Sequence, residues 1–278
     1  MVKVLITGAN GFVGKNLVEF YQQKQYQIIS INRQDNIEDG LLQNPEFIIN
    51  CAASIYDYQS MFNTNVLLVN HIIEHMKYNK CKFLQIGSSA EYGKKSHPTS
   101  ESDVLEPVSF YAGTKAAATM MCVSAAREFG LPIVVARPYS LYGIYEKEYR
   151  LFTRLYQALK NNTPMVLCEG YHDFIYIKDF IRGLDNLLFS NYDMHGDVVN
   201  FGSGVQTSNY EVLELFLRIM NIKEHQIQIE NRMAKSFESK TWVCNTDYAK
   251  SRYDFITQYT LYDGITDLIT IYQDRNII

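Results

Sequence analysis

A tyrosine and a lysine stand four positions apart in the run 111–115, Tyr-Ala-Gly-Thr-Lys. On a helix this spacing places both functional groups on one face, one turn apart. An ammonium group beside a phenol favours the phenolate, so we expect Lys115 to lower the pKa of Tyr111 and suit it to acid–base catalysis. By itself the pair is more typical of an exposed helix surface.

A second polar run, Gly-Ser-Ser-Ala-Glu-Tyr-Gly at 87–93, follows an apolar stretch that ends at Ile86. A serine hydroxyl at the end of a strand polarises a substrate carbonyl if the tyrosine lies beside it. The two runs together indicate chemistry at a carbonyl group.

Three glycines, Gly8, Gly11 and Gly14, come directly after the first apolar run, Val2 to Ile6. Between a strand and a helix, this spacing is typical of a dinucleotide-binding loop. The first glycine permits a tight turn, the second lets the backbone approach a pyrophosphate, and the third lets helix and strand pack closely. The helix N-terminus then favours the anion. The alternative is a glycine-rich turn without a ligand.

The second apolar run, Gln27 to Ile31, is followed by Asn32 and Arg33. An acidic residue there binds the adenosine ribose of NAD, whereas a guanidinium pairs with the 2′-phosphate of NADP. Arg33 therefore favours NADP(H), with NAD(H) still possible. The alternative for Arg33 is a solvated side chain in a loop.

Short β-rich runs alternate with helical patterns from Met1 to Gly143, which predicts βαβ units and a parallel sheet covered on both faces. After about Glu148 the alternation weakens. No linker separates the halves, so we expect the C-terminal part to pack on the first. The predicted strands are 2–6, 27–31, 47–50, 82–86, 132–136 and 174–177, and the later predicted helices lie near 151–160, 178–189 and 208–220.

The composition of the 278 residues excludes several classes of protein. Hydrophobic residues make up 47% and charged residues 20%, as in globular chains. With 26 basic and 30 acidic side chains, a net charge of −4, we expect no nucleic-acid partner. The five cysteines are dispersed and form no Cys/His cluster, so we expect reduced thiols and no metal site. Without a signal-peptide or membrane-span pattern, we expect no membrane partner and a cytoplasmic location.

Taken together, these patterns resemble the extended short-chain dehydrogenase/reductase family, specifically its NAD(P)-dependent nucleotide-sugar epimerases, dehydratases and reductases. The resemblance implies an α/β fold: a Rossmann-type doubly wound parallel sheet with a smaller mixed α/β C-terminal part. It implies an NAD(P)-binding domain over 1–147, to which segments of about 166–205 return, and a mainly substrate-binding part over 148–278. The ordered motifs that carry it are Thr7 to Gly14, Cys51-Ala52-Ala53, Asn65-Val66, Ser88 to Gly93, Tyr111 to Lys115, Arg137 to Gly143, Asp173 to Asp179 and Val199 to Gly204.

The resemblance also implies roles for single residues. Ser88 is the hydroxyl that polarises the carbonyl, Tyr111 is the acid or base, and Lys115 also holds the nicotinamide ribose. With Arg33, the expected cofactor-binding residues are Gly8, Asn10, Gly11, Phe12, Val13, Gly14, Cys51, Ala52, Ala53, Asn65, Tyr111, Lys115 and Pro138. The expected substrate-binding residues are Ser88, Ser89, Ala90, Tyr139, Ser140, Arg154 and His172.

On the substrate side the chain departs from the family pattern. His172 stands where relatives often carry a phosphate-binding arginine, and Ser140 replaces their usual asparagine. Arg150 or Arg154, at the head of the next helix, is a further candidate for that positive charge. An ordinary strand-start histidine and solvated arginines are the alternatives.

Other departures narrow the reaction. Sugar 4,6-dehydratases of the family carry an Asp-Glu pair where this chain has Ser89 and Ala90, and the epimerase-reductases that form GDP-fucose carry a cysteine at Ala90. Only 14 residues, 32–45, separate the second strand from the third. That is too few for the helix, strand and helix that epimerases place there. The motif pattern is closest to compact deoxysugar 4-ketoreductases.

We therefore expect an NADPH-dependent reductase of a keto group, at C4, on a nucleotide-linked deoxysugar or heptose. One alternative is an NAD-dependent nucleotide-sugar C4 epimerase, which keeps and recycles its cofactor. Another is a non-catalytic cofactor-sensing protein on the same fold. We also expect a homodimer, because relatives form a four-helix contact through the helices at 65–78 and 111–129, whose faces are apolar here.

Overall fold

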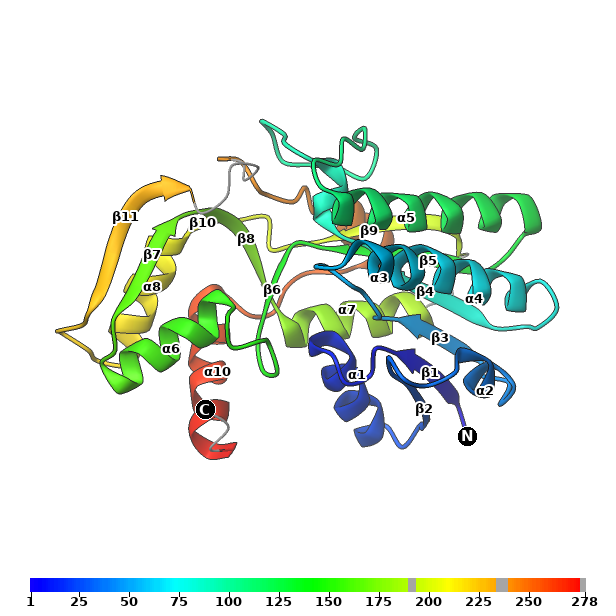
Figure 1. Ribbon diagram of the computed structural model, residues 1–278, viewed down its shortest axis with the longest axis horizontal. Helices are drawn as coiled ribbons and strands as arrows, with labels where there is room; N and C mark the ends of the chain where they lie inside the picture. Colours follow the sequence, from blue (N-terminus) through cyan, green and yellow to red (C-terminus); the bar gives the residue numbers. More distant parts are fainter. Residues whose placement is uncertain (190–193, 234–239, 276–278) are drawn as a thin grey trace.

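Six parallel strands form the large sheet of the molecule, with helices on both faces (Figure 1). They are β1 (Lys3–Thr7), β2 (Gln27–Ile31), β3 (Phe47–Asn50), β4 (Lys82–Ile86), β5 (Ile133–Pro138) and β9 (His195–Phe201). The computed structural model describes residues 1–189, 194–233 and 240–275, and the strand order within it is β2-β1-β3-β4-β5-β9. The predicted doubly wound α/β class is confirmed.

The helices that accompany this sheet form two layers. They are α1 (Phe12–Gln23), α2 (Ile37–Leu41), α3 (Tyr58–Phe62), the π-helix η1 (Asn63–Leu67), α4 (Leu68–Met76), the 3₁₀-helix η2 (Ser89–Tyr92), α5 (Phe110–Phe129) and α7 (Ile177–Phe189). Successive strand residues point to opposite faces. Leu5 and Ile48 therefore pack with α4 and α5, while Val4 and Ile49 pack with α1 and α7. Cover on both faces explains why these strands are almost continuously apolar.

The segment between β2 and β3 holds one short helix, α2. Asn36 caps it, because its side chain accepts a hydrogen bond from Glu38 N. The helix ends within a few residues of β3, so the segment has the compact form that its length predicts.

The remaining elements include a smaller part of the molecule, which contains two small sheets. The remaining strands are β6 (Ser140–Tyr142), β7 (Met165–Glu169), β8 (Tyr171–Tyr176), β10 (Gln206–Ser208) and β11 (Ile227–Met233). The remaining helices are α6 (Leu151–Asn161), α8 (Asn209–Ile219), α9 (Asp247–Tyr253) and α10 (Leu261–Arg275). β8 pairs in parallel with β6 and antiparallel with β10, and β11 pairs in parallel with β7. Within the 166–205 range, β9 joins the large sheet and α7 packs on it, whereas β7 and β8 lie in the smaller sheets. The division into domains stays a prediction.

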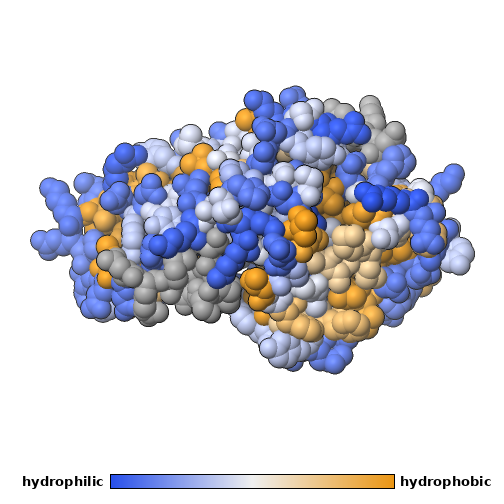
Figure 2. Space-filling view, turned by 90° about the horizontal axis from the view of Figure 1, so that it is seen from above, coloured by the Kyte–Doolittle hydropathy of each residue, from blue (hydrophilic) through white to orange (hydrophobic). Residues whose placement is uncertain are grey.

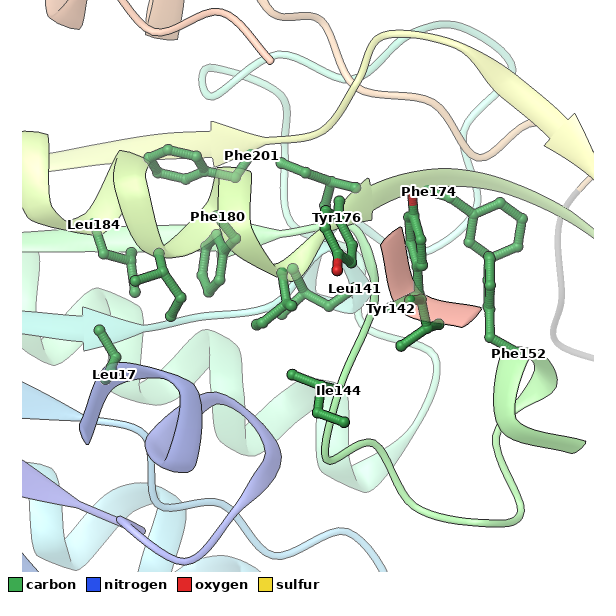
Figure 3. Packing of buried hydrophobic residues seen from close by; sticks show 14 of the residues in the cluster. Leu17, Leu141, Tyr142, Ile144, Phe152, Phe174, Tyr176, Phe180, Leu184 and Phe201 are labelled. Atoms are coloured by element: carbon green, nitrogen blue, oxygen red, sulfur yellow. The ribbon is translucent and has the colours of Figure 1, made fainter. Parts of the chain in front are cut away.

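One hydrophobic cluster joins the large sheet to the smaller part (Figure 3). It runs from Leu17 of α1 and Phe180 of α7 to Phe152 of α6. Tyr142 of β6 stacks on Phe152, with ring centroids 4.2 Å apart. The smaller part is therefore packed on the larger one and not merely tethered to it.

A buried carboxyl group lies in the loop between β6 and α6. Glu146 Oε1 accepts hydrogen bonds from Thr153 N (2.9 Å) and Thr153 Oγ1 (3.0 Å). The Thr153 hydroxyl also lies 3.0 Å from the Tyr272 hydroxyl of α10. Glu146 Oε2 is buried and has no hydrogen-bond partner among the described residues. Glu146 thus ties this loop to the first turn of α6.

Candidate active site

The glycine loop turns between β1 and α1 at the carboxyl end of the large sheet. Gly8 has a φ of +63°, which favours glycine, and a Cβ there would lie 2.9 Å from the Ala52 backbone. At Gly14 a Cβ would lie 2.2 Å from the Gly8 carbonyl oxygen. α1 begins after Gly11 without a side-chain cap, which leaves the N–H groups of Phe12 and Val13 available to an anion. The loop therefore fits the pyrophosphate of a dinucleotide.

Asn32 takes the place at the end of β2 where NAD-binding proteins carry an acid. Its Oδ1 accepts a hydrogen bond from Asn10 N (2.8 Å), and its own N donates to Asp35 Oδ2 (2.7 Å). Arg33 is exposed, and its guanidinium makes no hydrogen bond or ion pair with any residue in the described part of the chain. Arg33 is therefore available to a phosphate group at this edge.

The loop after β3, which contains the predicted residues Cys51, Ala52 and Ala53, is held from two sides. Ala52 N donates to the side chain of Asn50 (3.2 Å). Asn65 accepts from Ser54 N (2.9 Å) and donates both to Ser54 O (3.0 Å) and to Thr114 of α5 (2.9 Å). Asn65 thus positions this loop against α5, and its direct contact with a cofactor stays a prediction.

The first turns of α5 carry Tyr111 and Lys115. Ser109 caps the helix by accepting a hydrogen bond from Ala112 N (3.2 Å). Ser88, the N-cap of η2, places its hydroxyl in polar contact with the Tyr111 phenol. Lys115 is buried, and its Nζ donates to the carbonyl oxygen of Ile86 at the end of β4. The structure therefore brings together the three residues predicted to be catalytic.

The expected direction of the pKa shift at Tyr111 is wrong. Burial raises the pKa of Tyr111, contact with Ser88 lowers it, the charge of Glu91 raises it, and the charge of Arg150 lowers it. Lys115 is directed to the Ile86 carbonyl, and burial lowers its own pKa. Tyr111 is therefore a phenol that keeps its proton at neutral pH, which suits an acid.

Sequence reasoning missed a buried ion pair behind Ser88. Glu91 Oε2 lies 2.8 Å from Arg137 Nε, and the two side chains are only 0% and 3% exposed. Arg137 also donates from Nη1 to the Tyr92 hydroxyl (2.8 Å), which donates to Asn200 Oδ1 (2.8 Å). The signal in the sequence was one charged residue in each of two otherwise uncharged runs: Glu91 in 87–93 and Arg137 in 132–138.

A hollow opens beside η2. Two of the residues predicted to bind substrate, Ser89 and Tyr139, line it together with Thr99 and Trp242. Trp242 is the only tryptophan of the chain, and its ring packs edge-on toward that of Tyr139, with centroids 6.3 Å apart. Ala90, the third residue of this stretch, donates from its N to Ser88 Oγ (3.2 Å). Polar and aromatic groups thus converge beside η2, the helix that Ser88 caps.

The other predicted substrate residues lie on neighbouring elements. Ser140 Oγ and His172 Nδ1 are 3.2 Å apart, so the structure joins these two departures from the family pattern. Pro138 is the last residue of β5. Arg154 is exposed on α6, and its guanidinium makes no hydrogen bond or ion pair with a described residue. Phosphate binding by His172 or Arg154 stays a prediction.

Comparison with known proteins agrees with this geometry. The model of the NAD dependent epimerase/dehydratase family matches residues 4–202. The chain belongs to this family. YtcB of Bacillus subtilis, described as an uncharacterized UDP-glucose epimerase, is 24% identical over an alignment that covers 96% of this chain and 97% of YtcB. The GDP-6-deoxy-D-mannose reductase of Pseudomonas aeruginosa is 25% identical over 261 residues, which cover 84% of this chain and 85% of that enzyme.

Solved structures of the family share the fold along the whole chain. UDP-glucuronic acid 4-epimerase of Bacillus cereus, in complex with UDP-glucuronic acid and NAD, superposes with a TM-score of 0.87 at 23% identity and covers 99% of this chain and 100% of its own. RMD of Pseudomonas aeruginosa, complexed with NADPH, gives a TM-score of 0.86 at 20% identity with the same coverage. In the part of this chain that the structure describes, no helix has the length and apolar character needed to cross a bilayer.

Proposed function

We propose that the protein is an NADPH-dependent reductase of a keto group, at C4 of a nucleotide-linked deoxysugar or heptose. The observation that carries the proposal is the grouping of Ser88, Tyr111 and Lys115 at the ends of η2, α5 and β4. Ser89 and Ala90 offer no acid or base at the positions that dehydratases use. Similarity to a GDP-6-deoxy-D-mannose reductase supports the class of substrate.

Each residue of the group has a defined task in such a reduction. When bound, a reduced nicotinamide supplies a hydride to the carbonyl carbon of the substrate. The Tyr111 hydroxyl donates its proton to the carbonyl oxygen, and Ser88 donates a hydrogen bond to that oxygen. Since burial raises the pKa of Tyr111, this proton is present at neutral pH. Lys115, held by the Ile86 carbonyl, is placed to bind the ribose of the cofactor.

The preference for NADP(H) is supported by the end of β2. Asn32 stands in the place of the ribose-binding acid, and its side chain is already engaged by Asn10 N. Arg33 lies exposed next to it, without a partner among the described residues. A guanidinium in this position forms charge-assisted hydrogen bonds with a 2′-phosphate, which NAD lacks.

Tyr111→Phe tests the reaction, with Tyr78→Phe as the control, because Tyr78 is 85% exposed at the end of α4. Removing the acid is expected to lower kcat for reduction of UDP-, GDP-, CDP- or dTDP-linked keto-sugars with NADPH by about 10²–10⁴-fold. The control is expected to retain wild-type kcat. Full turnover by Tyr111→Phe contradicts the proposal. Purification with bound NAD, and interconversion of sugars without added cofactor, favours the C4 epimerase instead.

We also propose a cytoplasmic homodimer that pairs through α4 and α5. Apolar side chains gather on the right-hand part of the face shown in Figure 2, the half of the molecule that carries these helices in Figure 1. Leu67 of η1 is 46% exposed, and Phe110 and Met120 of α5 are 50% and 52% exposed. Burial of such side chains against a second copy stabilises an isologous interface.

A further inference from the structure

Glu91 occupies the space directly behind the proposed catalytic serine. Its side chain is fully buried, with Oε2 on Arg137 of β5 and Oε1 accepting a hydrogen bond from Ser88 N (2.7 Å). The Ser88 side chain in turn accepts from Ala90 N, which completes a capping box around η2. A Cβ at Gly87 would lie 2.8 Å from Glu91 Oε1, so the glycine leaves the carboxylate just enough room.

We propose that Glu91 is a positioning residue for the ketone reduction: held by Arg137, its carboxylate fixes the backbone of Ser88 and sets a negative charge facing Lys115. This inference rests on the proposed function of Ser88, Tyr111 and Lys115. Glu91 itself is not placed to touch substrate or cofactor, because Ser88 and Arg137 enclose its carboxylate.

The fixed backbone of Ser88 matters because the hydroxyl has two tasks. It contacts the Tyr111 phenol and must also reach the carbonyl oxygen of a substrate. A carboxylate that accepts the Ser88 N–H at 2.7 Å resists rotation of this residue. Rotating Ser88 away from Tyr111 would misplace the donor by a distance that catalysis does not tolerate.

The charge of Glu91 acts on both groups of α5. Burial lowers the pKa of Lys115, and Glu91 is the first of the groups that raise it again, followed by the thiols of Cys51 and Cys122. Burial also raises the pKa of those two thiols. Toward Tyr111, Glu91 favours the protonated phenol, while Arg150 opposes it. Glu91 therefore favours the protonated form of Lys115 and of Tyr111 alike.

The charge of Arg137 favours the ionised form of Glu91. Burial raises the pKa of Glu91, whereas the charges of Arg137 and then Lys115 lower it. Arg137 also donates a hydrogen bond to the Tyr92 hydroxyl, and the centroid of the Tyr92 ring lies 4.8 Å from the Arg137 guanidinium. The guanidinium is thus fixed on both sides, as a buried ion pair requires.

Glu91→Gln removes the charge at nearly constant shape, and Glu101→Gln is the matched control. Glu101 lies on the far side of the same network, where its Oε1 accepts from Asn200 N (2.8 Å) and the charge of Arg137 also reaches it. Because Glu101 is hydrogen-bonded to Asn200 and not to Ser88, its substitution perturbs the network without the proposed effect.

Two readouts separate positioning from stability. The Lys115 side chain is followed by NMR of [¹³Cε]lysine-labelled protein, with its signal assigned by its loss in Lys115→Met, and no substrate is needed. In Glu91→Gln the Lys115 titration is expected to move to lower pH, kcat to fall by about 10²-fold and the alkaline limb of the rate profile to move to lower pH. Glu101→Gln is expected to leave both pH profiles in place.

An unchanged Lys115 titration in Glu91→Gln, or an equal shift in Glu101→Gln, overturns the inference. If Glu91→Gln fails to fold because Arg137 is left unpaired, Glu91→Gln combined with Arg137→Met removes both charges, and the Lys115 titration must still move to lower pH. Failure of the proposed reduction shows separately, as full turnover by Tyr111→Phe, and leaves the lysine titration interpretable.

Discussion

The buried carboxyl group of Glu146 makes stability depend on pH in a direction that the structure fixes. Burial raises the pKa of Glu146 from 4.5 to about 7, opposed by Arg150 and by the hydrogen bonds of Thr153. The folded protein therefore keeps this proton up to about pH 7, whereas the unfolded chain releases it near 4.5. The stabilising contribution is complete below the unfolded value and is lost as pH rises through the folded one.

The size of this contribution follows from the two pKa values of Glu146. A shift of 2.5 units, from 4.5 to about 7, corresponds to about 3 kcal/mol over the full range. Between about pH 5.5 and about pH 8.5 the linkage relation leaves a loss of about 2 kcal/mol. Glu146→Gln keeps the acceptor for Thr153 but does not titrate, so it lacks this loss.

Urea unfolding of the wild type and Glu146→Gln at about pH 5.5 and about pH 8.5 measures the difference. The free energy of unfolding of the wild type, relative to the variant, is expected to fall by about 2 kcal/mol between the two conditions. Glu148→Gln, an exposed position of the same loop, is expected to show no such change. An equal difference between wild type and Glu146→Gln at both pH values refutes the reasoning.

Three further predictions follow from packing and charge. Gly14→Ala places a Cβ 2.2 Å from the Gly8 carbonyl oxygen and is expected to lose about 1–3 kcal/mol relative to Gly113→Ala, where nothing lies within 4 Å; equal urea stability of the two argues against the close approach. Arg33→Ala is expected to weaken NADPH binding by about tenfold or more in calorimetry while NADH binding stays constant, and parallel losses exclude a 2′-phosphate contact. Met120→Glu is expected to give monomers in sedimentation equilibrium, and an unchanged dimer places the interface elsewhere.

Much of the large sheet was predictable because its strands are short apolar runs between polar boundaries. β2, β3 and β4 have the bounds expected from their sequences. β7 and β11 were not predicted, because short strands whose partners lie far along the chain leave little local pattern. The one-turn helix α2 was also missed, since five residues show no periodicity.

Sequence patterns select the residues of the candidate site, but they do not indicate its electrostatics. Spacing alone indicated Tyr111 and Lys115, but not that the lysine reaches the Ile86 carbonyl. The sign of the Tyr111 shift depends on burial and on Glu91, which come from the fold. The contact of Ser140 with His172 joins two strands, so no local pattern signals it.

The position of β9 in the chain determines where this protein can be truncated and where parts of it can be exchanged with those of relatives. After β5 the chain forms β6, α6, β7 and β8 before α7 and β9 come back, and β9 then pairs along the outer side of β5. A fragment that stops near residue 147 would therefore expose the hydrogen-bonding edge of β5, a surface that invites aggregation. The smaller part is built from two segments, one inserted between β5 and α7 and one that follows β9, so exchanging it on this scaffold requires three splice points.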